Sequence, residues 1–278
     1  MRTILALVLA ALLAVPAAAG ETPWQEVAPG VKLRLISTGQ IKANGTTLVG
    51  LEIDMPPTTK TYWRIPGDTG MPIELDFAGS VGVLDHVLHW PFPKRDQTGD
   101  YLDYVYYGPT VLPMTLTLAP GAAEVELQAV LGICSDICIP AQAKFSLPLN
   151  DSQPDRSNAL RLKQALALAP IEWTDAELPF GAVSFDPERR LLDVAVMSAD
   201  VDLDSMIVTT GDGRPMFGAP QKSREANLVQ LPVLGELDAI DLEDRSVQIV
   251  FMTGMGAYQI DSTVTVAPTG GHGARAEH

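Results

Sequence analysis

The sequence predicts an all-β protein: an antiparallel β-sandwich followed, after a short helix, by a second and smaller β-sandwich domain. Short stretches in which apolar and polar residues alternate recur along most of the chain, as expected for half-buried strands. Prolines and glycines, 22 and 23 of the 278 residues, separate these stretches. Short strands punctuated in this way are typical of sandwiches and barrels.

The first strands can be placed one by one. In residues 31–35 the alternation puts Val31, Leu33 and Leu35 on one face. Asn44 and Gly45 then predict a tight hairpin turn into a strand at residues 47–53. Further strands are expected at residues 60–64, 73–77, 111–118, 124–130 and 143–149.

A domain boundary is expected after these strands. Residues 150–157 are polar and contain Pro154, and residues 159–168 predict a short helix that ends before Pro170. A second β pattern follows, with strands at residues 191–196, 206–210, 227–231, 247–252 and 258–266. We therefore expect a first domain at 21–150, a linker with a short helix at 151–170, a second β domain at 171–267 and a disordered tail at 268–278.

The N-terminus has the features of a secretory signal peptide at residues 1–19. A basic start at Arg2 precedes an apolar run over residues 4–15, and Ala17-Ala18-Ala19 supplies small residues for cleavage after about Ala19. This run is shorter than the roughly 20 residues that span a bilayer, so direct membrane insertion is not expected. The sequence therefore predicts export, to the periplasm if the source is a Gram-negative bacterium.

The composition excludes some classes of function. The chain carries 19 basic and 34 acidic residues, a net charge of −15. Such a charge repels nucleic acid and anionic membrane surfaces. With 46% hydrophobic and 19% charged residues, the chain is not a disordered acidic segment.

Cys134 and Cys138 are the only cysteines, and they lie between the strands predicted at residues 124–130 and 143–149. A disulfide needs Cα atoms closer than about 7 Å, whereas four steps along a straight strand span roughly 13 Å. If the two cysteines pair, the chain must turn between them. On spacing alone a redox-active pair and a structural staple are equally open, because the sequence does not give the reduction potential.

Four separated motifs add to the cysteine pair. They are residues 61–72, which begin Thr61-Tyr62-Trp63-Arg64, then Trp90-Pro91-Phe92-Pro93, residues 106–113, and the cysteine hairpin followed by Ile139-Pro140. Together they make residues from roughly Thr22 to Asn150 resemble the N-terminal periplasmic domain of the thiol:disulfide interchange protein DsbD. The tight Cys-x-x-x-Cys spacing is most similar to the copper-sensitivity-suppressor branch, ScsB.

The resemblance implies an immunoglobulin-like sandwich in which Cys134 and Cys138 exchange thiols and no cofactor is needed. Electrons would come from a membrane-embedded thiol reductase and pass to thioredoxin-like periplasmic proteins, so that the chain would be a component of a protein-disulfide reductase system. The family also has a loop that caps the sulfurs. Its counterpart is expected within residues 96–107, and its aromatic candidates are Tyr101, Tyr106 and Tyr107.

Asp136 lies between the cysteines. Its carboxylate would raise the pKa of a neighbouring thiol by like-charge repulsion, or its side chain would stabilise the turn. For the three tyrosines the alternative is that they simply pack the edge of the sandwich.

A second interpretation of the whole chain also stays open. The protein would be a non-catalytic periplasmic binding or assembly module with a structural disulfide, linked to copper tolerance. Ligands for a metal would come from the thiolates, from the histidines and from two thioethers: His86, His89, His272, His278, Met252 and Met255. Surface histidines and core methionines are the simpler interpretation, so no metal site is assigned.

Overall fold

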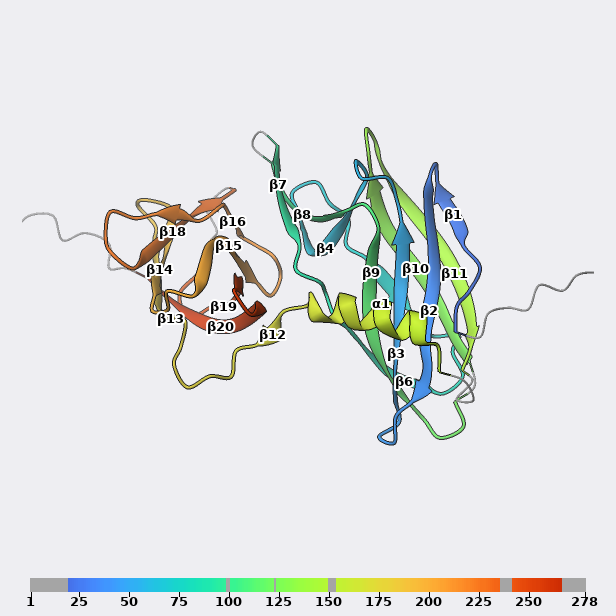
Figure 1. The fold of residues 1–278 in the computed structure, drawn as a ribbon. Helices are drawn as coiled ribbons and strands as arrows, with labels where there is room; N and C mark the ends of the chain where they lie inside the picture. The colour runs from blue at the N-terminus through green and yellow to red at the C-terminus, as the bar shows by residue number, and fades with distance from the viewer. Residues whose placement is uncertain (1–19, 99–100, 123, 150–153, 236–241, 267–278) are drawn as a thin grey trace, which may run out of the picture.

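The computed structural model describes residues 20–98, 101–122, 124–149, 154–235 and 242–266. These residues form two β domains joined by a short helix and an extended segment (Figure 1). The expected signal peptide at 1–19 and tail at 268–278, with His272 and His278, lie outside the described residues.

The first domain is a sandwich of two antiparallel sheets. One sheet has the strand order β1-β2-β3-β9-β6, and the other has the order β11-β10-β4-β8-β7, with β5 paired to β10. The strands are β1 (Gln25–Ala28), β2 (Val31–Ile41), β3 (Thr46–Asp54), β4 (Lys60–Gly67), β5 (Glu74–Asp76), β6 (Val83–Leu88), β7 (Lys94–Thr98), β8 (Tyr101–Tyr107), β9 (Thr110–Leu118), β10 (Glu124–Cys134) and β11 (Cys138–Pro148).

Apolar side chains from the inner faces of both sheets fill the space between them. Leu51 and Leu112 from the first sheet and Leu127 and Trp63 from the second are among the fully buried residues of this core. The Trp63 ring meets the Tyr104 ring edge to face, with 5.7 Å between the centroids. An aromatic pair in this geometry adds about 0.5–1.5 kcal/mol to the burial of its surface.

The helix α1 (Arg156–Ala167) packs on the first domain. It lies across β2, β3 and β9, as Figure 1 shows. Leu162 is completely buried and fits over Gly50, where an added Cβ would lie 2.5 Å from the leucine side chain. Arg161 pairs with Glu52 at 2.8 Å and with Glu21 at 3.2 Å. The segment that the sequence analysis treats as a linker is therefore bound to the first sandwich.

The second domain is one curved, nine-stranded sheet with the path β15-β19-β20-β13-β14-β18-β16; β12 pairs with β20 and β17 with β18. Its pairs are antiparallel except that β20 runs parallel to both β12 and β13. The strands are β12 (Ile171–Glu172), β13 (Phe180–Asp186), β14 (Leu191–Val196), β15 (Val201–Thr210), β16 (Met216–Phe217), β17 (Gln221–Lys222), β18 (Leu228–Leu234), β19 (Ser246–Thr253) and β20 (Gly256–Val266).

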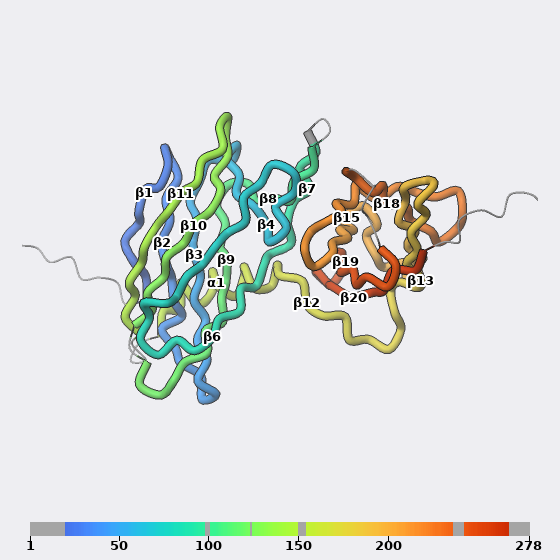
Figure 2. Tube along the Cα trace, turned by 180° about the vertical axis from the view of Figure 1, so that it is seen from behind, coloured from blue at the N-terminus to red at the C-terminus, as the bar shows by residue number. Residues whose placement is uncertain are grey.

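The two domains touch through the edge of the first domain that carries β7 and β8 (Figure 2). Arg95 of β7 donates hydrogen bonds to the main-chain carbonyls of Asp204, at 3.1 Å, and Met206. The Tyr104 hydroxyl donates to the Phe217 carbonyl at 3.3 Å. Apolar residues of the second domain, including Ile207, are continuous with the core of the first.

The predicted all-β fold class is confirmed. The expected strands of the first domain correspond to β2, β3, β4, β5, β9, β10 and β11, and the Asn44-Gly45 turn joins β2 to β3. Four strands of the first domain were not expected, β1, β6, β7 and β8, and β7 and β8 occupy much of the segment 96–107 in which a capping loop is expected. Within the described residues, no helix is both long and apolar enough to cross a membrane.

Candidate redox site

The two cysteines close the β10–β11 hairpin. Cys134 is the last residue of β10 and Cys138 the first of β11, and they face each other as the final pair of the ladder. Their Cα atoms are 4.1 Å apart and their sulfurs form a disulfide. Residues 135–137 make the turn, with the Ser135 N–H donating to the Ile137 carbonyl at 3.3 Å. The structure thus contains the turn that pairing requires.

The two halves of the disulfide have unequal surroundings. Cys134 is only 1% exposed and packs with Tyr62, Val105 and Tyr107. Cys138 is exposed, at the start of an edge strand. An incoming thiolate must reach the sulfur that it attacks. The Cys138 sulfur is therefore the accessible one.

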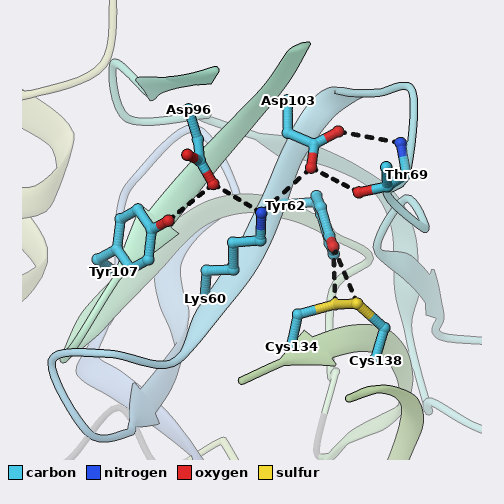
Figure 3. The surroundings of a disulfide bond; sticks show 8 residues. All are labelled: Lys60, Tyr62, Thr69, Asp96, Asp103, Tyr107, Cys134 and Cys138. Atoms are coloured by element: carbon cyan, nitrogen blue, oxygen red, sulfur yellow. Dashed lines mark hydrogen bonds and ion pairs between the residues drawn. A yellow bond between two sulfur atoms is a disulfide. The ribbon is translucent and has the colours of Figure 1, made fainter. Parts of the chain in front are cut away.

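Tyr62 of β4 points its hydroxyl at both sulfurs (Figure 3). The oxygen lies 2.7 Å from Cys134 Sγ and 3.6 Å from Cys138 Sγ. Because a disulfide sulfur carries no hydrogen, the hydroxyl is the donor. Burial raises the pKa of Tyr62, so the phenol keeps its proton at neutral pH and remains able to donate.

Two glycines hold the Tyr62 ring in place. A Cβ added at Gly70 would lie 2.4 Å from the ring, and one added at Gly132 would lie 3.1 Å from it. The first distance is a clash and the second is tighter than ordinary contact, so both positions favour a residue without a side chain. The direction in which Tyr62 points is thus fixed by backbone on both sides of its ring.

An ion-pair network adjoins Tyr62. The Lys60 ammonium lies 2.6 Å from an Asp96 carboxylate oxygen and 3.1 Å from one of Asp103. Asp103 also accepts from the Thr69 N–H and hydroxyl, and Asp96 accepts from the Tyr107 hydroxyl at 2.7 Å (Figure 3). Burial alone would lower the pKa of Lys60, but its hydrogen bonds to the two carboxylates outweigh burial and raise it.

Strand pairing brings this network to the disulfide. Cys134 pairs with Lys60 across β10 and β4, and Lys60 pairs with Tyr107 across β4 and β8. Cross-strand partners lie on the same face of a sheet, as do alternate residues of one strand. The disulfide, Lys60, Tyr62 and Tyr107 therefore occupy the outer face of the second sheet.

The same alternation separates the tyrosines predicted for the cap. Tyr107 lies on the disulfide face and contacts Asp96. Tyr106 lies on the opposite face, buried in the sandwich core, with its hydroxyl donating to the Pro91 carbonyl at 2.7 Å. Tyr101 is 61% exposed at the other end of β8, roughly 20 Å along the strand from Tyr107. The structure brings only Tyr107 of the three to the disulfide.

Asp136 is exposed at the tip of the hairpin, between the two cysteines. It is thus part of the turn itself. The residues that the sequence analysis did not single out for the site are Tyr62, Lys60, Thr69, Asp96 and Asp103. Two of them, Tyr62 and Thr69, lie in the first family motif at residues 61–72. Their partners in the site are distant in sequence, however: 72 and 76 residues away for Tyr62 and 34 for Thr69.

The histidine pair does not form a metal centre. The His86 ring packs on Phe77, with centroids 4.6 Å apart, and His89 Nε2 lies 2.8 Å from the Thr115 hydroxyl. Among the described residues, no group of three or more His, Cys, Asp and Glu side chains is placed to hold a metal ion.

A family model described as the N-terminal part of the thiol:disulfide interchange protein DsbD matches residues 32–150. This segment contains both cysteines, Tyr62 and the Lys60 network. The predicted resemblance to the DsbD N-terminal domain is confirmed.

A solved structure of known periplasmic origin matches most of the chain. The crystal structure of the N-terminal periplasmic domain of ScsB from Proteus mirabilis covers 89% of this chain and 99% of its own, with a TM-score of 0.70 and 21% sequence identity. At that identity the match shows a shared fold, and its coverage extends beyond the DsbD-like segment into the second β domain. Titin Ig tandem domains A164-A165 match with a TM-score of only 0.21 and 8% identity, over 85% of this chain and 98% of theirs, which does not indicate a shared fold. No curated protein matches the sequence.

Proposed function

We propose that this chain is a periplasmic thiol:disulfide interchange module in which the Cys134–Cys138 pair exchanges with protein partners. The observation that carries the proposal is the unequal environment of the two sulfurs. Cys138 is exposed, whereas Cys134 is buried and accepts a hydrogen bond from Tyr62 at 2.7 Å. This arrangement gives one sulfur for attack and one to leave.

In the reductive direction a partner thiolate attacks Cys138 Sγ. A new disulfide forms between the partner and Cys138 while the Cys134–Cys138 bond breaks, and the electron pair of the broken bond goes to Cys134 Sγ. The Tyr62 hydroxyl, already aimed at this sulfur, donates a hydrogen bond to the developing thiolate. A second partner thiolate then attacks its own mixed-disulfide sulfur and releases Cys138, so two electrons have been transferred.

In the oxidative direction the same atoms act in reverse. The Cys138 thiolate attacks a partner disulfide, and Cys134 resolves the mixed disulfide by attacking Cys138 Sγ. The match to the DsbD N-terminal family supports redox partners in general. We propose that the electron donor is a membrane-embedded thiol reductase and the acceptor a thioredoxin-like periplasmic protein. We assign Tyr62 and Tyr107 the shielding of Cys134 that the sequence analysis assigns to a capping loop.

Trapping tests this assignment. Cys134→Ser leaves the exposed Cys138 without its resolving partner, so it should accumulate a reducible adduct with an oxidised thioredoxin-like protein. Cys138→Ser is the matched control and should accumulate far less, because its remaining thiol is buried. If neither variant forms an adduct, the disulfide is a structural staple and the alternative of a non-catalytic binding module holds.

A further inference from the structure

The tip of the β10–β11 hairpin exposes two apolar side chains close to Cys138 in sequence. Ile137 is 74% exposed and Ile139 is 38% exposed, and they flank Cys138 on either side in the sequence. The tip projects from the first domain and is not covered by the second domain in either view (Figures 1 and 2). Exposed apolar residues beside a functional group mark an interaction surface more often than isolated ones do.

The backbone at this place is a poor partner for an added strand. β11 is the edge of its sheet, and unpaired edges attract other strands. Pro140, two residues after Cys138, has no N–H to donate. Recognition at this point of the edge therefore depends on side chains, and the exposed apolar side chains nearest to Cys138 in sequence are the two isoleucines, Ile137 in the turn and Ile139 on the opposite face of β11.

We propose that Ile137 and Ile139 form a docking surface for the redox partner, which must present an apolar, non-acidic surface around its reactive cysteine. The inference rests on the proposed function. A mixed disulfide holds its two sulfurs about 2.05 Å apart, so a protein bonded to Cys138 Sγ must lie against the tip of the hairpin. The exposed Asp136 between the cysteines and the net charge of −15 disfavour an acidic partner surface.

Two reductants of different size distinguish an effect on partner docking from an effect on the intrinsic reactivity of the disulfide. Dithiothreitol reaches a sulfur without covering Ile137 or Ile139, whereas reduced thioredoxin must bring a protein surface against them. The experiment measures the second-order rate constant for reduction of Cys134–Cys138 by each reductant, in the full chain and in the double variant Ile137→Ser with Ile139→Ser. Leu84→Ser with Val87→Ser, on the exposed face of β6, is the matched control.

The tip variant should react with dithiothreitol within about twofold of the wild-type rate and with thioredoxin at least about tenfold more slowly, the equivalent of about 1.4 kcal/mol of lost interaction in the transition state. The β6 control should keep both rates. Equal slowing with both reductants, or no slowing with thioredoxin, overturns the docking surface while leaving the exchange function intact. A wild-type protein that reacts with dithiothreitol but not with any protein dithiol overturns the proposed function instead.

Discussion

Removing the Tyr62 hydroxyl should slow opening of the disulfide. Tyr62→Phe keeps the ring between Gly70 and Gly132 and deletes only the oxygen that lies 2.7 Å from Cys134 Sγ. In the wild type the hydroxyl donates to a neutral sulfur before attack and to a developing thiolate during it. The change therefore removes an interaction that strengthens as the reaction proceeds.

The size of the effect follows from the charge on the acceptor. A hydrogen bond to a charged group contributes about 1.5–3 kcal/mol and one to a neutral group about 0.5–1.5 kcal/mol, a difference of about 1–1.5 kcal/mol. Tyr62→Phe therefore removes a stabilisation that the Cys134 thiolate has and the neutral sulfur has only in part. Because a less stabilised thiolate leaves more slowly, and about 1.4 kcal/mol corresponds to a tenfold change in rate, we expect attack at Cys138 to slow by about three- to tenfold.

The assay is reduction by dithiothreitol, stopped by alkylation and followed by mass spectrometry. Tyr104→Phe is the matched control, since it deletes a buried hydroxyl of the same domain, one that donates to the Phe217 carbonyl rather than to sulfur. The rate of disulfide reduction in this variant should equal that of the wild type. A folded Tyr62→Phe protein that is reduced as fast as the wild type, or faster, would refute the role of the hydroxyl.

Three further predictions concern residues that support the site. Tyr106→Phe should lower the free energy of unfolding by about 1–2 kcal/mol, because the Pro91 carbonyl loses its hydrogen-bond donor. The rate of disulfide reduction by dithiothreitol should stay the same; a faster rate would show that Tyr106 shields the disulfide. Leu162→Ala should lower the free energy of unfolding, measured with urea, by about 2–5 kcal/mol, since Leu162 is fully buried against β3. A loss below about 1 kcal/mol would show that α1 is only loosely packed on the first domain. The raised pKa values of Lys60 and Tyr62 mean that above about pH 10 the folded chain binds more protons than the unfolded chain. The contribution of these two groups to stability should therefore be constant up to about pH 10 and be lost above it, and Lys60→Met should make the alkaline fall in stability shallower; a stability that rises with alkaline pH contradicts this sign.

The sequence predicts those parts of the fold that rest on local patterns. Alternation identifies β2, and the Asn44-Gly45 turn fixes where β3 begins; Gly45 has a φ of 78°, which that turn requires. The sequence does not predict strand β7, because Lys94–Thr98 is a polar edge strand in which apolar and polar residues do not alternate. In β8 the alternation of the strand puts Tyr106 and Tyr107 on opposite faces, so the aromatic residues of this segment do not form the single cap that the family resemblance implies.

In the candidate site, too, local sequence predicts some residues, while others are brought together only by the fold. Cys134 and Cys138 could be identified because they are the only cysteines and their neighbours predict a hairpin. Lys60 could not, because its partners Asp96 and Asp103 are 36 and 43 residues away and meet it only through the pairing of β4, β7 and β8. Exposure of one sulfur and burial of the other likewise depends on how the hairpin tip meets β4.

The reduction potential of Cys134–Cys138 tests the central claim most directly. Equilibration of the full-length protein with glutathione or dithiothreitol buffers of known ratio, read by alkylation and mass spectrometry, gives this value. An exchanging disulfide should have a potential above about −300 mV, within reach of thioredoxin-like partners. A potential below about −300 mV would identify a structural staple and contradict the account.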